Sequence, residues 1–266
     1  MKKILIPFIL ITIIISWQLI ADNTHNYYLN GKYLSVCWED TKAVFDAPLH
    51  WDKKEILMTG VLSGIGIALY LYDKQMLDFV QDHKSDVLTT FTDITNYLGD
   101  GWVIIPSQLL LYGYGYFTDD LKARKIALET MESFVIVGAT VTALKMLTGR
   151  HRPNSHDDPY NFEGPTLSSD NRSFPSGHTA VVFSWATVLA DNFRDQPAVG
   201  IIAYTLAAGT GFSRMYKNKH WLSDVFVAAL LGHFITKKIV SRHEHDEPST
   251  TVFSPLPLGF SISFSF

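Results

Sequence analysis

Apolar residues gather in six segments of helical length along this chain, and polar or glycine-containing stretches separate them. Segments of about 13 to 20 residues suit either the helices of a packed bundle or short membrane spans. The pattern therefore predicts an all-α fold built as a six-helix bundle. The expected helices are Ile56–Tyr72, Trp102–Phe117, Leu128–Leu147, His178–Ala190, Ala198–Phe212 and Trp221–Ile235.

The two ends of the chain have different patterns. Residues 1–21 begin with Lys2 and Lys3 and continue as an apolar run, which is typical of a signal peptide or an uncleaved anchor and predicts export to the cell envelope. Residues 22–54 are polar and aromatic without a period, so we expect an irregular segment lying on a helical domain of residues 55–240. Residues 241–266 form a polar tail, whose last nine positions alternate as in a β-strand.

Hydropathy and charge bear on whether the bundle crosses a membrane. The mean hydropathy is only +0.10, which is low for six spans. Glu129 and Glu132 begin the third segment, and the loop charges conflict with the positive-inside rule if the N-terminus is exported. These features favour a periplasmic or membrane-associated bundle over an integral inner-membrane protein.

Composition narrows the class of protein. The chain has 266 residues, 47% of them hydrophobic, which is enough for a filled core and excludes a disordered chain. Lys and Arg number 22 against 26 Asp and Glu, so no basic excess indicates nucleic acid as a partner. Cys37 is the single cysteine and cannot form an intramolecular disulfide.

Two clusters of candidate functional residues follow the third segment. Lys145 lies near the end of that segment and Arg152-Pro153 follows a glycine break, so two cations could point at one place; a snorkelling lysine and a basic helix end explain them equally well. Further on, Pro175-Ser176-Gly177-His178 precedes an apolar helix. Ser176 is placed to cap it, and the amides around Gly177 would form an anion site; a surface histidine is the alternative for His178.

A third cluster precedes the sixth segment. Ser213-Arg214 is followed by His220 and, four residues later, by Asp224. On a helix this spacing lets the carboxylate hold the imidazole, which leaves the other ring nitrogen free as a base or nucleophile. The alternative is that Asp224 favours the helix N-terminus while His220 is solvated.

Together, the three clusters resemble the signature of the type 2 phosphatidic acid phosphatase and vanadium haloperoxidase superfamily. The pattern is Lys, six residues, Arg-Pro; then Pro-Ser-Gly-His; then Ser-Arg, five residues, His, three residues, Asp. Every fixed position is filled here, and the resemblance covers about residues 55 to 238. It implies the helical bundle of that family and a phosphatase activity.

The resemblance also implies roles for these residues. His220, held by Asp224, would attack phosphorus, and His178 would protonate the leaving group. The groups that would hold the phosphoryl oxygens are Lys145, Arg152, Ser176, Gly177 and Arg214. Three side-chain cations can neutralise a dianion, so no metal or cofactor is expected, and His243-Glu244-His245-Asp246 is interpreted as a solvated stretch.

Other polar residues near the motifs receive ordinary structural roles. Arg150 and His151 are expected to be solvated loop residues, whereas Asp93 and Asp100 are expected to cap or end helices. Trp221 beside His220 is expected to pack.

The predicted partner is a phosphorylated small molecule or a lipid phosphate, such as a phosphatidate or a polyprenyl diphosphate, with membrane contact. The sequence sets no oligomeric state. Two alternatives stay open: a vanadate-dependent haloperoxidase on the same site, and a non-catalytic envelope scaffold.

Overall fold

The computed structural model describes residues 27–155, 158–168 and 171–245. Within them the chain is almost entirely helical, and strand-like pairing is limited to one bridge between Arg150 and Phe162. The all-α prediction is confirmed, whereas the signal segment 1–21 and the terminal strand lie outside the described residues. The elements are α2 (Gly31–Asp46), η1 (Ala47–His50), α3 (Lys53–Leu71), α4 (Asp73–Asp82), α5 (Asp86–Leu98), α6 (Gly101–Phe117), α7 (Leu121–Thr148), α8 (Gly177–Asn192), α9 (Pro197–Tyr216) and α10 (Leu222–His245).

Each of the six predicted helices corresponds to one helix of the structure: α3, α6, α7, α8, α9 and α10. The largest boundary differences are in α7 and α10. Helix α7 begins earlier than predicted because the Asp120 side chain accepts a hydrogen bond from the Ala123 amide and caps it. Helix α10 continues to His245, beyond the end of its apolar stretch.

Three further helices were not predicted. The expectation of an irregular segment over residues 22–54 was wrong for residues 31–46, where the Asn30 side chain caps α2. Helices α4 and α5 are short and rich in polar residues, and α5 buries Thr92, Thr95 and Leu98. Val87, Phe91 and Ile94 form an apolar stripe on α5, but all three are exposed, so the buried face of this helix does not follow its apolar pattern.

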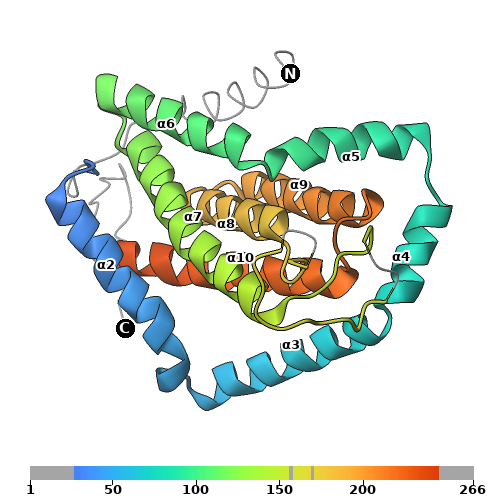
Figure 1. The fold of residues 1–266 in the computed structure, drawn as a ribbon. Coiled ribbons are helices and arrows are strands. Elements are labelled where there is room, and N and C mark those ends of the chain that lie inside the picture. The colour runs from blue at the N-terminus through green and yellow to red at the C-terminus, as the bar shows by residue number, and fades with distance from the viewer. Residues whose placement is uncertain (1–26, 156–157, 169–170, 246–266) are drawn as a thin grey trace, which may run out of the picture.

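Helix α8 lies at the centre of the fold and packs against α7, α9 and α10. Its Val182, Ala186 and Val188 are fully buried in the main hydrophobic core. Figure 1 shows the outer helices around this bundle: α3 runs along one side, α5 and α6 along the opposite side, and α2 and α4 cross the two ends. The core thus fixes four helix ends that carry the motif residues.

Helix α3 is unusual because none of its residues is buried, although it is strongly apolar. Ile56, Leu57, Val61, Ile67 and Leu71 are all more than half exposed. By length and hydropathy, α3 and α7 are the two helices of the described chain that could cross a membrane, but 56% of the apolar stretch of α7 is buried inside the bundle. Helix α3 therefore presents its apolar surface outward along its whole length, and α6 also exposes large apolar side chains, among them Trp102, Leu109 and Phe117.

The polar loop after α7 folds back on the end of that helix. Gly149 ends α7 in the left-handed region, with φ of 57°. A Cβ there would lie 2.1 Å from the carbonyl oxygen of Gly164, so only glycine lets the two backbones approach. The Gly164 amide donates to the Thr148 carbonyl, which holds the loop against α7.

The crossing of α8 and α10 predicts a sharp dependence on Gly232. A Cβ at this position would lie 2.3 Å from the Ala180 carbonyl oxygen. We expect Gly232→Ala to lower the free energy of unfolding by roughly 1–3 kcal/mol, measured by thermal unfolding in detergent. The control is Gly138→Ala in α7, where a Cβ meets nothing within 4 Å; it should be neutral or slightly stabilising. Equal melting temperatures for the two variants would contradict the close crossing.

Candidate active site

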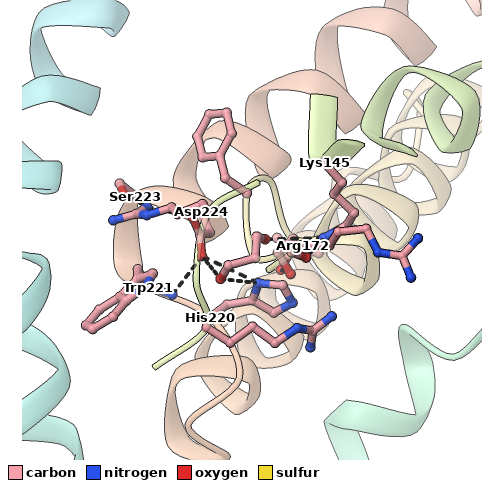
Figure 2. Close-up of polar contacts among 12 residues, drawn as sticks. Lys145, Arg172, His220, Trp221, Ser223 and Asp224 are labelled. Atoms are coloured by element: carbon pink, nitrogen blue, oxygen red, sulfur yellow. Dashed lines mark hydrogen bonds and ion pairs between the residues drawn. The ribbon is translucent and has the colours of Figure 1, made fainter. Parts of the chain in front are cut away.

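The three motifs meet where four helix ends converge. Lys145 comes from the last turn of α7, His178 from the first turn of α8, Arg214 from the end of α9 and Asp224 from the first turn of α10. The Ser176 amide donates to the Asp224 carbonyl over 3.1 Å, and a Cβ on Gly177 would lie 3.8 Å from Lys145 Cε. Figure 2 shows Lys145, His220 and Asp224 converging on the same small volume.

His220 precedes α10 rather than lying on it, yet it still reaches Asp224. The distance from His220 Nδ1 to Asp224 Oδ2 is 3.5 Å, and both side chains are buried. Ser173 Oγ lies 3.4 Å from the same nitrogen and donates to Asp224 Oδ2 over 2.5 Å. Because Nδ1 faces the carboxylate, we infer that it carries the proton and that Nε2 keeps its lone pair.

The Asp224 carboxylate accepts hydrogen bonds from several donors besides His220, the one partner that the sequence predicted. Its Oδ2 accepts from the Trp221 amide at 3.0 Å, and its Oδ1 accepts from Arg150 Nη1 at 2.6 Å. Burial alone would raise the pKa of Asp224, but Arg150 and the bonds from His220 and Ser173 outweigh burial and hold that pKa below its usual range. The carboxylate therefore stays ionised beside His220.

Arg150 is the centre of this buried network, so the expectation that it is solvated was wrong. The side chain is fully buried, and its Nη2 pairs with Asp73 Oδ2 at 2.7 Å. Asp73, at the start of α4, in turn accepts from the Ser223 amide at 2.8 Å and from Ser223 Oγ at 2.5 Å. Arg150 thus connects α4 to the first turn of α10 through two carboxylates.

His151 was also wrongly expected to be solvated. It is only 7% exposed, and its Nε2 lies 2.8 Å from Glu163 Oε1. Its carbonyl accepts from the indole nitrogen of Trp221 over 3.0 Å, which confirms that Trp221 packs.

The two aspartates expected at helix ends differ. Asp100 caps α6, accepting from the Trp102 amide, as predicted. Asp93 lies inside α5 instead and pairs with Lys217, so its expected role at a helix end was wrong.

Three cations surround His178. Burial, and then the charge of Arg214, lower the pKa of His178 to about 4; Lys145 and Arg152 act in the same direction, while Asp100 opposes them. Burial, and then repulsion from Arg152, lower the pKa of Arg214 to about 10. An anion placed among these groups would relieve the repulsion, which is the electrostatic signature of a site for a multiply charged oxyanion.

Ser176 and Lys145 make specific contacts in this site. Ser176 is the N-cap residue of α8, but its side chain makes no capping bond; its Oγ accepts from Thr179 Oγ1 at 2.9 Å. Lys145 Nζ donates to the carbonyls of Arg172 and Ser173 at 2.8 and 3.2 Å. These carbonyls hold the ammonium next to Gly177.

Sequence reasoning missed four residues of the network: Asp73, Ser173, Ser223 and Arg150 in its buried role. Arg150 and Ser173 lie next to motif positions in the sequence, and this proximity could have identified them as candidates. Asp73 had no such signal, since it is separated from Arg150 by 77 positions and meets it only through the fold.

A pair of neutral histidines within a ring of cations, with a buried carboxylate behind one of them, defines a phosphoryl-transfer type of site. Comparison with known proteins agrees with that class. Residues 127–245 match the family model of the PAP2 superfamily. This helical region, which contains all three motifs, is thus similar to the PAP2 superfamily.

Individual relatives are similar to this chain over only part of their length or of its own. A lipid A 1-phosphatase of Porphyromonas gingivalis is 31% identical over 49% of this chain and 26% of its own length, so the match spans about a quarter of that relative. A probable diacylglycerol pyrophosphate phosphatase of Schizosaccharomyces pombe is 27% identical over 66% of this chain and 76% of its own.

A solved structure shares the fold. The crystal structure of a transmembrane PAP2-type phosphatidylglycerolphosphate phosphatase from Bacillus subtilis superposes with a TM-score of 0.53 at 19% identity. The superposition covers 81% of this chain and 98% of that one.

The Arg150 network predicts a large stability effect. Arg150→Met would leave Asp73 and Asp224 as unpaired buried carboxylates, so we expect the free energy of unfolding to fall by about 3–5 kcal/mol. The control is Arg194, which is half exposed and pairs with Asp191 and Glu244. Arg194→Met should lower the free energy of unfolding by at most about 1 kcal/mol. Denaturant unfolding of both variants measures the difference, and similar values would argue against the buried network.

The low histidine pKa values predict a pH response to anion binding. Burial also lowers the pKa of His220 to about 3, so both histidines should be neutral at pH 6 in the free protein. A bound phosphate favours the charged imidazole, and we therefore expect inorganic phosphate to raise the pKa of His178. Histidine titration by NMR with and without phosphate measures this, and a His178 already protonated at pH 7 without anion would contradict it.

Proposed function

We propose that this protein is a phosphatase that hydrolyses phosphomonoesters or diphosphates of lipids through a phosphohistidine intermediate. The observation that carries the proposal is the convergence of Lys145, Arg152 and Arg214 around His178, next to a His220 held by Asp224. The match of residues 127–245 to the family model of the PAP2 superfamily supports it independently.

In the first step His220 Nε2 attacks phosphorus in line with the leaving oxygen. The N–P bond forms while the P–O bond to the leaving group breaks, and the Nδ1 proton faces Asp224, which stabilises the positive charge that develops on the imidazole. His178 donates a proton to the leaving oxygen. The pKa of His178 is about 4 in the free site and rises when the phosphate binds, so binding of the substrate protonates the general acid.

In the second step a water molecule replaces the histidine. Neutral His178 now accepts a proton from the water, whose oxygen attacks phosphorus, and the N–P bond of His220 breaks. His220 is then neutral and His178 is again protonated; when inorganic phosphate leaves, His178 releases the proton that it took up on substrate binding, and both imidazoles are neutral as in the free site.

The cations supply the charge that the reaction needs. Arg152 and Arg214 offer planar donors to the equatorial oxygens, Lys145 offers a point charge, and the Ser176 hydroxyl and Gly177 amide complete the cradle. Electrostatic stabilisation of this kind is usually the largest contribution to phosphoryl transfer. We propose that the reaction requires no metal ion or cofactor.

Two observations support a lipid as the substrate. The relatives described above are named as phosphatases of lipid A and of diacylglycerol pyrophosphate. In addition, a cavity of about 960 Å³ between α3 and α10 has mostly apolar walls, including Ile67, Phe226 and Leu230, and extends to Arg150 of the catalytic network. A cavity of this size and chemistry suits apolar ligands.

The outward apolar surface of α3 supports membrane association. Contact with a bilayer would shield side chains that nothing in the described chain covers. Export, with the site in the periplasm, remains a proposal that rests on the sequence of residues 1–21.

The proposal is tested by phosphate release from the purified protein in detergent with EDTA present. The substrates are an aryl phosphate, a phosphatidate and a polyprenyl diphosphate. We expect chelator-resistant release that favours a lipid and is abolished in His220→Ala, and acid-labile phosphate on the protein after rapid quenching.

The control is His83→Ala, an exposed histidine at the end of α4, which should keep full activity. His178→Gln should lower turnover of lipid phosphates by roughly 10²–10⁴-fold. Its effect should be smaller on the aryl phosphate, whose leaving group needs less protonation. Release that persists in His220→Ala would overturn the histidine mechanism, and a folded protein without release from any substrate would overturn the phosphatase.

A further inference from the structure

A second cluster of titratable side chains lies at the opposite end of α10 from the active site. Asp40 of α2, Glu132 of α7 and His243 of α10 each offer a ligand atom, and these atoms all lie within 4.8 Å of one another. All three residues are buried. The interpretation of His243 as part of a solvated stretch was therefore wrong, since this side chain is only 4% exposed.

The contacts within the cluster are short and directed. His243 Nε2 lies 2.8 Å from Asp40 Oδ2 and 3.5 Å from Glu132 Oε2. Ligand atoms about 2.1 Å from a tetrahedral ion lie roughly 3.4 Å from one another. The distance from His243 to Glu132 already matches this spacing, and the shorter distance from His243 to Asp40 would reach it after a small side-chain rotation.

One unpartnered atom in the cluster independently indicates a missing ligand. Glu132 Oε1 is buried and makes no hydrogen bond. Glu129 Oε1, on a side chain with no exposed surface, instead pairs with His243 Nδ1 over 3.4 Å. Buried carboxylate oxygens without a partner are rare in native proteins and require an explanation such as a bound ion.

The charges of the cluster point to a cation. Asp40, Glu129 and Glu132 carry three negative charges when ionised, and Arg242 adds one positive charge through its pair with Asp40. A divalent cation bound to a neutral His243 would neutralise the two charges that remain among these side chains. Burying such charges without compensation is strongly unfavourable.

We propose that Asp40, Glu132 and His243 bind a structural divalent metal ion of the class that accepts mixed carboxylate and imidazole ligands, with Zn²⁺ as the probe. Glu129 is a positioning residue: it faces the second ring nitrogen of His243, in the carboxylate–histidine–metal arrangement that fixes the tautomer of a ligand. Asn192 Nδ2 donates to Glu129 Oε2 over 2.7 Å and holds this carboxylate in place.

The metal would fasten α2 to the bundle. Helix α2 crosses the C-terminal end of α10, as Figure 1 shows, and Tyr33 of α2 also donates to Glu132 over 2.8 Å. His243 lies about 28 Å along α10 from Asp224, at a rise of about 1.5 Å per residue. The ion would therefore stabilise the fold without taking part in the reaction, and the proposal stands apart from the proposed function.

The test is the metal content of the purified full chain after incubation with Zn²⁺ and gel filtration. We expect about one zinc per chain in the wild type, and less than about a tenth of this in Glu132→Gln and His243→Gln. The matched control is His233→Gln, which alters another partly buried histidine of α10 that contacts Tyr204 instead. It should retain the metal.

Two further measurements remain informative if a ligand variant fails to fold. Zinc at about a hundred times its dissociation constant should raise the melting temperature of the wild type by roughly 5–10 °C, and EDTA should reverse the shift. Glu129→Gln should weaken zinc affinity by roughly 10–100-fold without abolishing binding.

Wild-type protein that retains no zinc and melts at the same temperature with and without EDTA would overturn the proposal and assign the cluster to an ion-pair network. Equal zinc in the wild type and Glu132→Gln would place the ion elsewhere and overturn it as well. Phosphate release in EDTA, measured below the melting temperature, reports on the proposed function separately.

Discussion

The pairing of Arg150 with Asp73 and Asp224 is the interaction on which the active site depends. All three side chains are fully buried, so each charge is stable only while its partners are present. The guanidinium fixes the first turn of α10 against α4 and keeps Asp224 ionised. Asp224 then orients His220, and its carbonyl accepts from Ser176 at the start of α8. Loss of this one cation would therefore lower the stability of the fold and disturb the orientation of His220 together.

Helix α10 joins two polar clusters of different character. At its N-terminal end, cations surround neutral histidines, so the local charge is positive and favours an anion. At its C-terminal end, carboxylates surround His243, so the local charge is negative. Between the two ends the helix packs against α8, where Gly232 permits a close crossing. The same rigid helix thus carries the proposed phosphate site and the proposed cation site at opposite ends, and the distance of about 28 Å between them makes their charges nearly independent.

Much of this protein was predictable from apolar period and short motifs. The six apolar segments became helices, and the motif residues His178, His220 and Asp224 came together. The errors share one cause: the structure uses polar residues in its interior. Glu129 and Glu132 were taken as evidence against a membrane span, but both lie in a buried cluster, and α5 buries threonines while its apolar residues Phe91 and Ile94 are exposed. Burial of a polar group depends on partners far away in sequence, which a local pattern does not contain.

The sequence by itself determined the helical class, the core helices and the identity of the groups that we propose to hold the phosphate, because helical period and motif spacing are local properties of the chain. Only the tertiary structure decided that Arg150 is buried between two carboxylates, that α3 turns its apolar surface outward, and that α2 brings Asp40 to His243 across 203 positions. Each of these depends on which helices become neighbours, and that choice is made by packing of the whole chain rather than by any segment of it.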